Sequence, residues 1–139
     1  MKYRFVFGMI AVLLLAVLAA CGGTSSSTSN QMNVTLSDFK IQSAQTTFTA
    51  GTKYHFVVTN NGKVAHEFMI MPMGMQMGNM SMDEMHKMAL AMIDNVAPGE
   101  TKTVDYTFTQ STGGQQLEVA CHLPGHYEAG MHQGITVTS

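Results

Sequence analysis

The sequence predicts an all-β fold, an antiparallel β-sandwich with one short methionine-rich helix inserted between two strands. Two observations support this prediction. From residue 33 to the C-terminus, short segments rich in Thr and Val alternate apolar and polar residues, and turn signals separate them. One stretch, residues 81–93, instead runs without glycine or proline and opens with a helix-capping pattern.

The first twenty residues have the pattern of an export signal. Lys2 and Arg4 precede an apolar run over residues 5–18, which is short for a membrane span of about 20 residues. Small residues follow and lead to Cys21. A cysteine directly after such a site resembles the lipobox of bacterial lipoproteins, which implies that Cys21 carries a lipid. The alternative is an ordinary signal peptide with an incidental cysteine.

This assignment sets the domain organisation. We expect a lipoprotein signal peptide over residues 1–20, the lipidated cysteine and a flexible Gly/Ser/Thr linker over residues 21–31, and one domain over residues 32–139. The lipid would be the only membrane attachment, on the periplasmic or outer side of a membrane. The chain has two cysteines, so lipidation of Cys21 leaves Cys121 without a disulfide partner. Cys121 is then a liability or a reactive or liganding thiol.

The charge balance argues against nucleic acid as a partner. Removing Lys2 and Arg4 with the signal leaves five lysines, no arginine and nine acidic residues, a net charge of −4. Such a chain has no basic stripe with which to follow a phosphate backbone.

The expected strands follow one another along the domain. "KYHFVVTNNG" alternates apolar residues and ends in the strong turn Asn61-Gly62, whereas "NVTLSDFKI" alternates with a slip near Asp38 that we interpret as a β-bulge. The remaining expected strands are "HEFMIM", "TKTVDYTFTQ" after the turn "APGE", "QLEVAC" and the closing "GITVTS".

The helix is expected over "MDEMHKMALAMI". Ser81 and Glu84 have the spacing of a capping box, which marks its start. Met85, Met88 and Met92 would then share one face, and we expect these flexible thioethers to fill gaps in the core.

The stretch "CHLPGHYEAGM", residues 121–131, places a thiol, two imidazoles and a thioether within eleven positions. A catalytic cysteine would use a histidine but has no need of Met131. Structural zinc takes four Cys or His ligands, and this domain has one cysteine. One thiolate, two imidazoles and a weak axial methionine are instead the ligands of a blue-copper site.

The second imidazole must come from elsewhere in the chain. His66 begins the strand "HEFMIM" directly after the turn "NNGKVA". In a sandwich, the start of that strand can meet the loop that holds Cys121, His126 and Met131 at one end of the fold. The sequence therefore predicts that His66 is the missing partner.

These residues resemble a known family. "NNGKVAHEF", "CHLPGHYEAGM" and a closing "GITV" strand are similar to the cupredoxins, with a loop length like that of azurin and auracyanin. The combination of "HEFMI" and "PGHYEAGM" looks closer still to periplasmic cupredoxins associated with copper tolerance. The resemblance implies a Greek-key β-sandwich with one type 1 copper, held by His66, Cys121 and His126 in the trigonal plane and by Met131 axially. It also implies that Asn61 braces the cysteine loop.

Three other polar residues lie in or beside this loop. His122 follows Cys121 directly, so its side chain should point to the opposite face, and we predict that it is not a ligand of this copper. His132 and Glu128 either tune the site, contact a partner or are simply solvated.

Ten of the twelve methionines outside the signal fall within residues 69–92. Five of them are expected in a glycine-containing loop, where two interpretations stay open. Clustered thioethers are suitable secondary ligands for Cu(I), and an adaptable methionine surface can also dock a partner. These five are Met71, Met73, Met75, Met77 and Met80.

Two functions follow, neither of them enzymatic. The first is electron transfer outside the cytoplasm by Cu(II)/Cu(I) cycling, with His126 as the exit and "LPG" and Tyr127 as an apolar docking rim for a redox partner protein. The alternative is copper tolerance or delivery to a copper-handling protein, with the methionine loop over residues 71–80 capturing Cu(I). A copper enzyme needs further histidine clusters and domains, which this chain lacks. We expect a monomer.

Overall fold

The computed structural model describes residues 30–74 and 80–139. The predicted signal peptide, Cys21 and nearly all of the linker lie outside the described residues, as do Met75 and Met77. Within the described ranges, no helix has both the length and the apolar character needed to cross a membrane.

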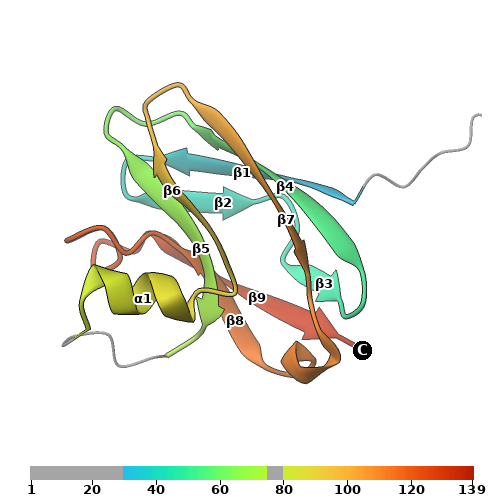
Figure 1. Cartoon of the computed structure of the whole chain (residues 1–139). Coiled ribbons are helices and arrows are strands. Elements are labelled where there is room, and N and C mark those ends of the chain that lie inside the picture. The colour runs from blue at the N-terminus through green and yellow to red at the C-terminus, as the bar shows by residue number, and fades with distance from the viewer. Residues whose placement is uncertain (1–29, 75–79) are drawn as a thin grey trace, which may run out of the picture.

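The domain is a sandwich of two β-sheets with one helix at its side (Figure 1). The first sheet has the order β2-β1-β4-β7, and the second has the order β3-β9-β8-β5-β6. The elements are β1 (Gln31–Ser37), β2 (Lys40–Ser43), β3 (Thr47–Thr49), β4 (Lys53–Asn60), β5 (His66–Pro72), α1 (Met82–Met88), β6 (Ala91–Val96), β7 (Thr101–Thr107), β8 (Gln116–Ala120) and β9 (His132–Thr138), with a 3₁₀ turn at Gln110–Thr112. The predicted β-sandwich with one inserted helix is confirmed.

Strand pairing is mixed, whereas we expected antiparallel pairs throughout. β1 runs parallel to β4, and β3 runs parallel to β9. The other pairs, including β4–β7, β5–β6, β5–β8 and β8–β9, are antiparallel. The parallel pairs arise because the chain crosses between the two sheets after β2 and again after β3, so sequence neighbours are not always neighbours in a sheet.

The predicted bulge near Asp38 is wrong, because the chain reverses there. β1 and β2 form an antiparallel hairpin in which Ser37 pairs with Lys40, and Asp38 and Phe39 make the turn. Phe39 has φ = 59°, a left-handed conformation that is uncommon for a bulky residue. The turn places both side chains at the end of the sandwich where the chain also begins β5.

The helix is shorter than predicted. Its start is as expected, with Ser81 and Glu84 forming a reciprocal capping box, but it ends at Met88 and the next residues turn into β6. Met92 therefore lies in a strand and pairs with Met69 of β5, while Met88 is exposed. Of the three methionines expected in the core, Met85 alone is buried. Pairing with β5 has overridden the helical propensity of "ALAMI".

Two groups of buried side chains hold the molecule together. The sandwich core joins both sheets and contains a set of aromatic rings, in which Phe48 contacts Tyr54, Phe56 and Phe108 with ring centroids 4.9–5.7 Å apart. The second group, which we call the methionine cluster, lies where α1 covers β5 (Figure 1). It consists of Met69, Met71 and Met85, with Met80, Met82, Ala89 and Met92 packed against it.

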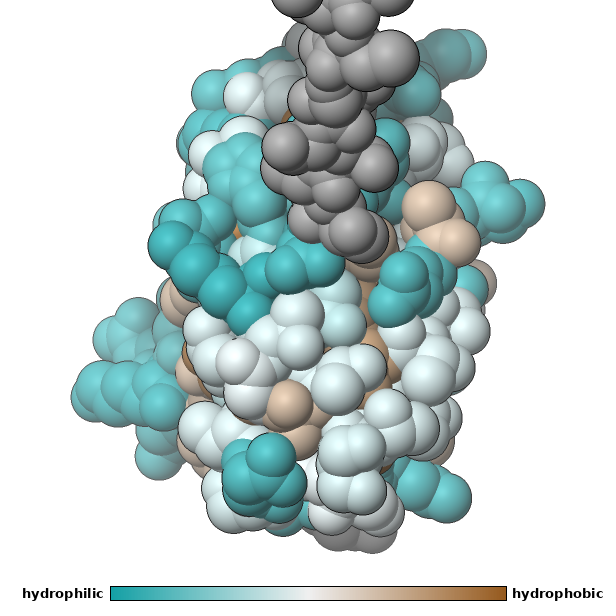
Figure 2. Space-filling model, turned by 90° about the vertical axis from the view of Figure 1, so that its right-hand side faces the viewer, coloured by the Kyte–Doolittle hydropathy of each residue, from teal (hydrophilic) through white to brown (hydrophobic). Residues whose placement is uncertain are grey.

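The outer surfaces of the sheets follow the alternation that the sequence predicts. In β4 buried and more exposed residues alternate, and the more exposed ones are mainly polar. Figure 2 views the molecule from the right-hand side of Figure 1 and shows a face covered mainly by hydrophilic and near-neutral residues, with only small apolar spots.

Candidate metal centre

The loop before β5 fixes the position of His66, and a buried asparagine holds this loop. The side-chain amide of Asn60 donates to the carbonyls of Val64 and Val96 at 2.8 Å, and its Oδ1 accepts from the N–H of Gly62 at 2.8 Å. We expected Asn61 to brace the site, but the side chain of Asn61 is exposed. The bracing residue is its neighbour Asn60, which supports the loop before His66 instead of the cysteine loop.

Asp38 and Gly62 pack against the Nε2 side of the His66 imidazole. Asp38 Oδ1 accepts from the N–H of Lys63 at 2.8 Å and lies 3.7 Å from His66 Nε2. A Cβ on Gly62 would lie 2.5 Å from Asp38 Oδ1 and 3.0 Å from His66 Nε2. Gly62 is therefore required for close packing. The Lys63 N–H also lowers the pKa of Asp38 and so favours its charged form.

The loop after β8 carries the other three predicted ligands and is closed by two backbone hydrogen bonds. The Cys121 N–H donates to the carbonyl of Met131 at 3.0 Å, and the Met131 N–H donates to the carbonyl of His126 at 3.0 Å. Gly125 and Gly130 make the turns, with φ of 81° and 94°. These bonds hold Cys121, His126 and Met131 close together.

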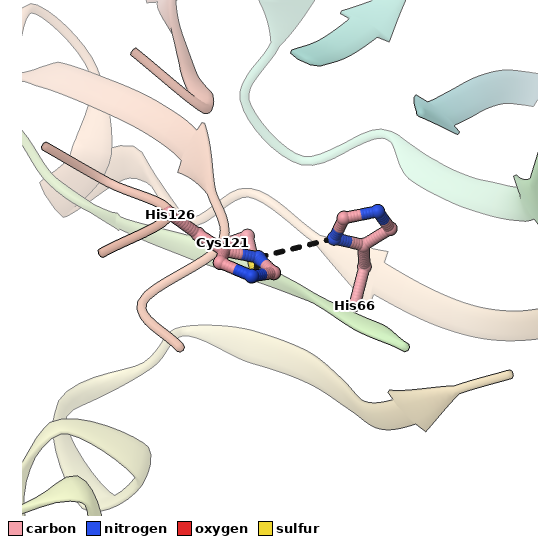
Figure 3. Close-up of side chains that lie close together, drawn as sticks. All are labelled: His66, Cys121 and His126. Carbon is pink, nitrogen blue, oxygen red and sulfur yellow. Dashed lines mark hydrogen bonds between the residues drawn. The ribbon is translucent and has the colours of Figure 1, made fainter. Parts of the chain in front are cut away.

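Three donor atoms converge between β5 and this loop (Figure 3). His66 Nδ1 lies 3.1 Å from His126 Nδ1, and Cys121 Sγ lies 3.4 Å from the same nitrogen. The ligand atoms of His66, Cys121 and His126 all lie within 4.8 Å of one another. His66 and Cys121 are fully buried, whereas His126 is half-buried.

Met131 completes the predicted set. It is fully buried in the same part of the sandwich core as Cys121, and its backbone bonds to both Cys121 and His126. The four residues thus offer one thiol, two imidazoles and one thioether at the same end of the fold. This mixture of soft sulfur and borderline nitrogen donors suits copper in both of its common oxidation states.

Burial favours the neutral forms of the His66 imidazole and the Cys121 thiol. It lowers the pKa of His66, and the neighbouring His126 lowers it further. Burial raises the pKa of the Cys121 thiol, although the backbone N–H groups of Glu67 and Leu123 partly offset this effect. Because a metal needs the thiolate, metal binding must release the thiol proton and is weakened by acid.

Phe39 is a residue of this site that the sequence analysis missed. Its ring meets the half-buried His126 edge-on, with centroids 5.3 Å apart, and 51% of Phe39 is exposed. Val64, on the loop before His66, is 46% exposed. The available signal was the break in apolar alternation at Asp38-Phe39. We interpreted this break as a bulge, whereas it marks the turn of a hairpin.

Glu67 is the second residue that sequence reasoning missed. Its carboxylate is fully buried, with Oε1 accepting from the His122 N–H at 2.8 Å and Oε2 lying 3.2 Å from His86 Nε2 of α1. Its own N–H points at Cys121 Sγ at 3.5 Å. Glu67 thus connects the cysteine, the next residue and the helix. An acidic residue near the start of the otherwise largely apolar strand "HEFMIM" was the available signal.

The structure separates His122 from the three converging donors. Its ring is buried and stacks on Tyr127, with centroids 4.6 Å apart, and Tyr127 stacks on His132 on its other face. The Tyr127 hydroxyl donates to Glu118 at 3.0 Å; burial and this carboxylate raise the pKa of Tyr127 to about 12. Tyr127 is therefore stacked between two histidines and is half-buried, and the docking rim of "LPG" and Tyr127 stays a prediction. Glu128 is exposed.

The five methionines predicted as secondary Cu(I) ligands have different environments. Met71 is fully buried in β5, so its placement in a loop is wrong. Met73 is 40% exposed, and Met80 packs against the methionine cluster. Met75 and Met77 lie outside the described residues.

Comparison with known proteins decides the family. No protein-family model matches the chain. The copper-resistant cuproprotein CopI of Pseudomonas aeruginosa is 30% identical over 147 aligned positions, which cover 78% of this chain and 76% of that protein. The chain belongs to the CopI family of cuproproteins. CopI of Vibrio cholerae is 38% identical over 89 positions, covering 58% of this chain and 47% of that longer relative.

Solved structures support the same fold for this CopI-family chain. Auracyanin from Roseiflexus castenholzii superposes with a TM-score of 0.63 at 18% identity, over 80% of this chain and 98% of auracyanin. An azurin from Methylomonas sp. strain J gives a TM-score of 0.61 at 13% identity, over 78% of this chain and 98% of the azurin. The CopI-family chain is therefore a cupredoxin in fold and a copper-binding protein. The donors of His66, Cys121, His126 and Met131 fit a type 1 copper.

Proposed function

We propose that the protein serves copper tolerance outside the cytoplasm, holding copper at a type 1 site of His66, Cys121, His126 and Met131. The carrying observation is the convergence of three donors within 4.8 Å in a chain whose relatives are named copper-resistant cuproproteins. In this role the protein binds copper and exchanges electrons through it, and it is not an enzyme.

The chain's own residues prepare this site in three ways. Asn60, Gly62 and Asp38 fix the loop and the ring of His66. Backbone bonds of Met131 close the loop around Cys121. Bound copper supplies the Cu(II)/Cu(I) couple there. Donors that are already in place need little movement when the preferred geometry changes, because the set of ligands suits both oxidation states.

A tolerance assay tests this proposal. A strain that lacks the gene is complemented with the wild-type protein, with Cys121→Ser or with Met92→Leu as a matched conservative control, and growth is measured against rising copper. We expect the wild type and Met92→Leu to restore growth and Cys121→Ser to fail at equal protein levels. Full tolerance with Cys121→Ser would contradict the proposal.

An electron carrier is the second candidate, and the surface around His126 favours it. His126 is the half-buried member of the converging trio, and the exposed ring of Phe39 lies against it. A left-handed conformation costs conformational free energy for a bulky apolar residue such as Phe39. Its presence at an exposed turn therefore suggests a role beyond folding. We infer that Phe39 and Val64 form the apolar contact through which a redox partner approaches His126.

Electron self-exchange between copies of the copper-loaded protein probes this surface without a known partner. Phe39→Asn keeps a residue that tolerates positive φ and removes the apolar ring, and Phe39→Tyr is the matched control. NMR line broadening in partly oxidised samples should show slower exchange for Phe39→Asn and near wild-type exchange for Phe39→Tyr. Equal rates in all three proteins would remove the support for a carrier.

We also propose that the protein is exported and attached to a membrane by lipid on Cys21 alone, meeting a redox or copper-handling partner there as a monomer. Mass spectrometry of the mature N-terminus tests the anchor. A diacylglyceryl mass on a chain that begins at Cys21 is expected, and an unmodified N-terminus elsewhere would contradict it.

A further inference from the structure

A cavity of about 280 Å³ lies between α1 and the loop that follows Cys121. It is separate from the three converging donors: none of His66, Cys121 and His126 lines it. Its lining combines three methionines with one buried histidine and three loop residues, namely Met80, Met82, Met85, His122, Pro124, Tyr127 and Glu128.

The methionines of the cavity are arranged by the start of the helix. Met82 and Met85 are three residues apart in α1, which places them on neighbouring positions of one helix face. Met80 precedes the N-cap residue Ser81, so the capping box fixes where the chain enters this face. Three thioethers therefore border one cavity. Thioethers are soft ligands that select Cu(I) over harder cations.

His122 brings a nitrogen donor to the same cavity. The residue is only 6% exposed, and its Nε2 has no hydrogen-bond partner among the described residues. Buried polar atoms without a partner are rare in folded proteins and call for an explanation.

The backbone separates His122 from the copper site next to it. Cys121 and His122 are consecutive, but Cys121 Sγ lies 3.4 Å from His126 Nδ1, whereas the His122 ring stacks on Tyr127. Glu67 holds this pair, since its N–H points at Cys121 Sγ and its carboxylate accepts from the His122 N–H at 2.8 Å. The same carboxylate lies 3.2 Å from His86 of α1, which keeps the helix against the pair.

We propose that Met80, Met82, Met85 and His122 form a second copper site, specific for Cu(I). The site differs from the predicted methionine loop, because two of its sulfur donors come from the helix and its nitrogen from the residue after the type 1 cysteine. It does not depend on the proposed function, since a Cu(I) ion can bind here whether or not the type 1 site carries electrons.

A Cu(I) titration of the Cys121→Ala protein tests this site without the type 1 copper. The purified full chain competes for Cu(I) with the colorimetric chelator bicinchoninate under anaerobic conditions. We expect one tightly bound Cu(I), which the double variant Met82→Leu/Met85→Leu loses. Leucine keeps the volume of methionine, so the fold is retained. The matched control Met69→Leu/Met92→Leu changes two methionines of the same cluster that do not line the cavity, and it should bind normally.

If Cys121→Ala does not fold, the otherwise wild-type protein provides the same test, with two Cu(I) ions expected and one expected after Met82→Leu/Met85→Leu. The NMR signals of the His122 ring and of the Met80, Met82 and Met85 methyl groups should shift on addition of Cu(I), while those of Met92 stay in place. Unchanged Cu(I) binding in Met82→Leu/Met85→Leu would overturn the proposal, as would loss of binding on Met75→Leu/Met77→Leu alone. If the type 1 charge-transfer band is absent but Cu(I) still binds at Met80, Met82, Met85 and His122, the proposed function is contradicted and this inference is supported.

Discussion

The sandwich core and the methionine cluster both contain residues of β5, but they consist of different kinds of side chain. Stacked aromatic rings and β-branched side chains fill the sandwich core, which includes Cys121 and Met131. The methionine cluster consists of flexible thioethers between α1 and β5. Aromatic and branched side chains have few rotamers and fix the positions of their neighbours, whereas methionine adapts to its surroundings.

This difference teaches how one small domain can combine a rigid site with an adaptable one. The type 1 ligands are held together by strands, tight turns and buried hydrogen bonds. The side chains around His122 can rearrange around an ion, because half of the other lining residues are methionines and two of these are on the short helix α1.

The largest expected effect concerns the sandwich core. Phe48→Ala removes the ring that contacts Tyr54, Phe56 and Phe108, and should lower the free energy of unfolding by about 3–5 kcal/mol. Met69→Leu, at an equally buried position of the methionine cluster, should cost less than about 1.5 kcal/mol. Urea denaturation of the metal-free proteins measures both. Similar losses in the two variants would show that the cluster is packed as rigidly as the core.

Two glycine substitutions compare a fixed neighbour with a flexible one. Gly62→Ala would press a Cβ to 2.5 Å from Asp38 Oδ1 and 3.0 Å from the Asp38 backbone nitrogen. Gly62→Ala should lower the free energy of unfolding by about 1–3 kcal/mol. It should also weaken copper binding, because it displaces His66. Gly134→Ala meets only the terminal methyl of Met73 at 2.8 Å, which can swing away.

We therefore expect Gly134→Ala to be nearly neutral in denaturant unfolding and in copper affinity. If Gly134→Ala lowers stability and copper affinity as much as Gly62→Ala does, the expectation is contradicted, because this would mean that Met73 cannot move. Copper affinity is measured by competition with a chelator of known affinity.

The smallest effect is a pH dependence at Asp38. The Lys63 N–H lowers the pKa of Asp38 below its usual value of 3.8, so the folded state favours the carboxylate. The resulting stability is present above pH 3.8 and is lost as the pH falls through the lower, folded-state pKa. Asp38→Asn should therefore flatten the acid side of the stability profile of the metal-free protein. An unchanged slope below pH 3.8 would show that the turn does not hold this carboxylate.

Local signals in the sequence were sufficient to predict the type 1 donors. They were not sufficient to predict how the methionine-rich segment folds. The donors His66, Cys121, His126 and Met131 carry distinctive chemistry at a distinctive spacing, and alternation placed them at strand ends. The same alternation could not show that "ALAMI" leaves the helix, because pairing of Met92 with Met69 is a contact between segments far apart in the sequence.

The residues that support the site were harder to predict for the same reason. Asn60 and Asn61 are both plausible turn residues, and which one is buried depends on the register of β4. Glu67 is an ordinary charged residue until the fold places it against His122 and His86. Phe39 acquires a role only because the hairpin brings it to His126, 87 positions away in the chain.

The most direct test of the type 1 site is a Cu(II) titration of the purified protein, followed by visible and EPR spectroscopy. We predict one equivalent of copper with an intense thiolate-to-copper charge-transfer band, and loss of that band in Cys121→Ser. A colourless protein with only weak tetragonal copper signals would contradict the account, because it would mean that His66, Cys121, His126 and Met131 do not bind one metal together.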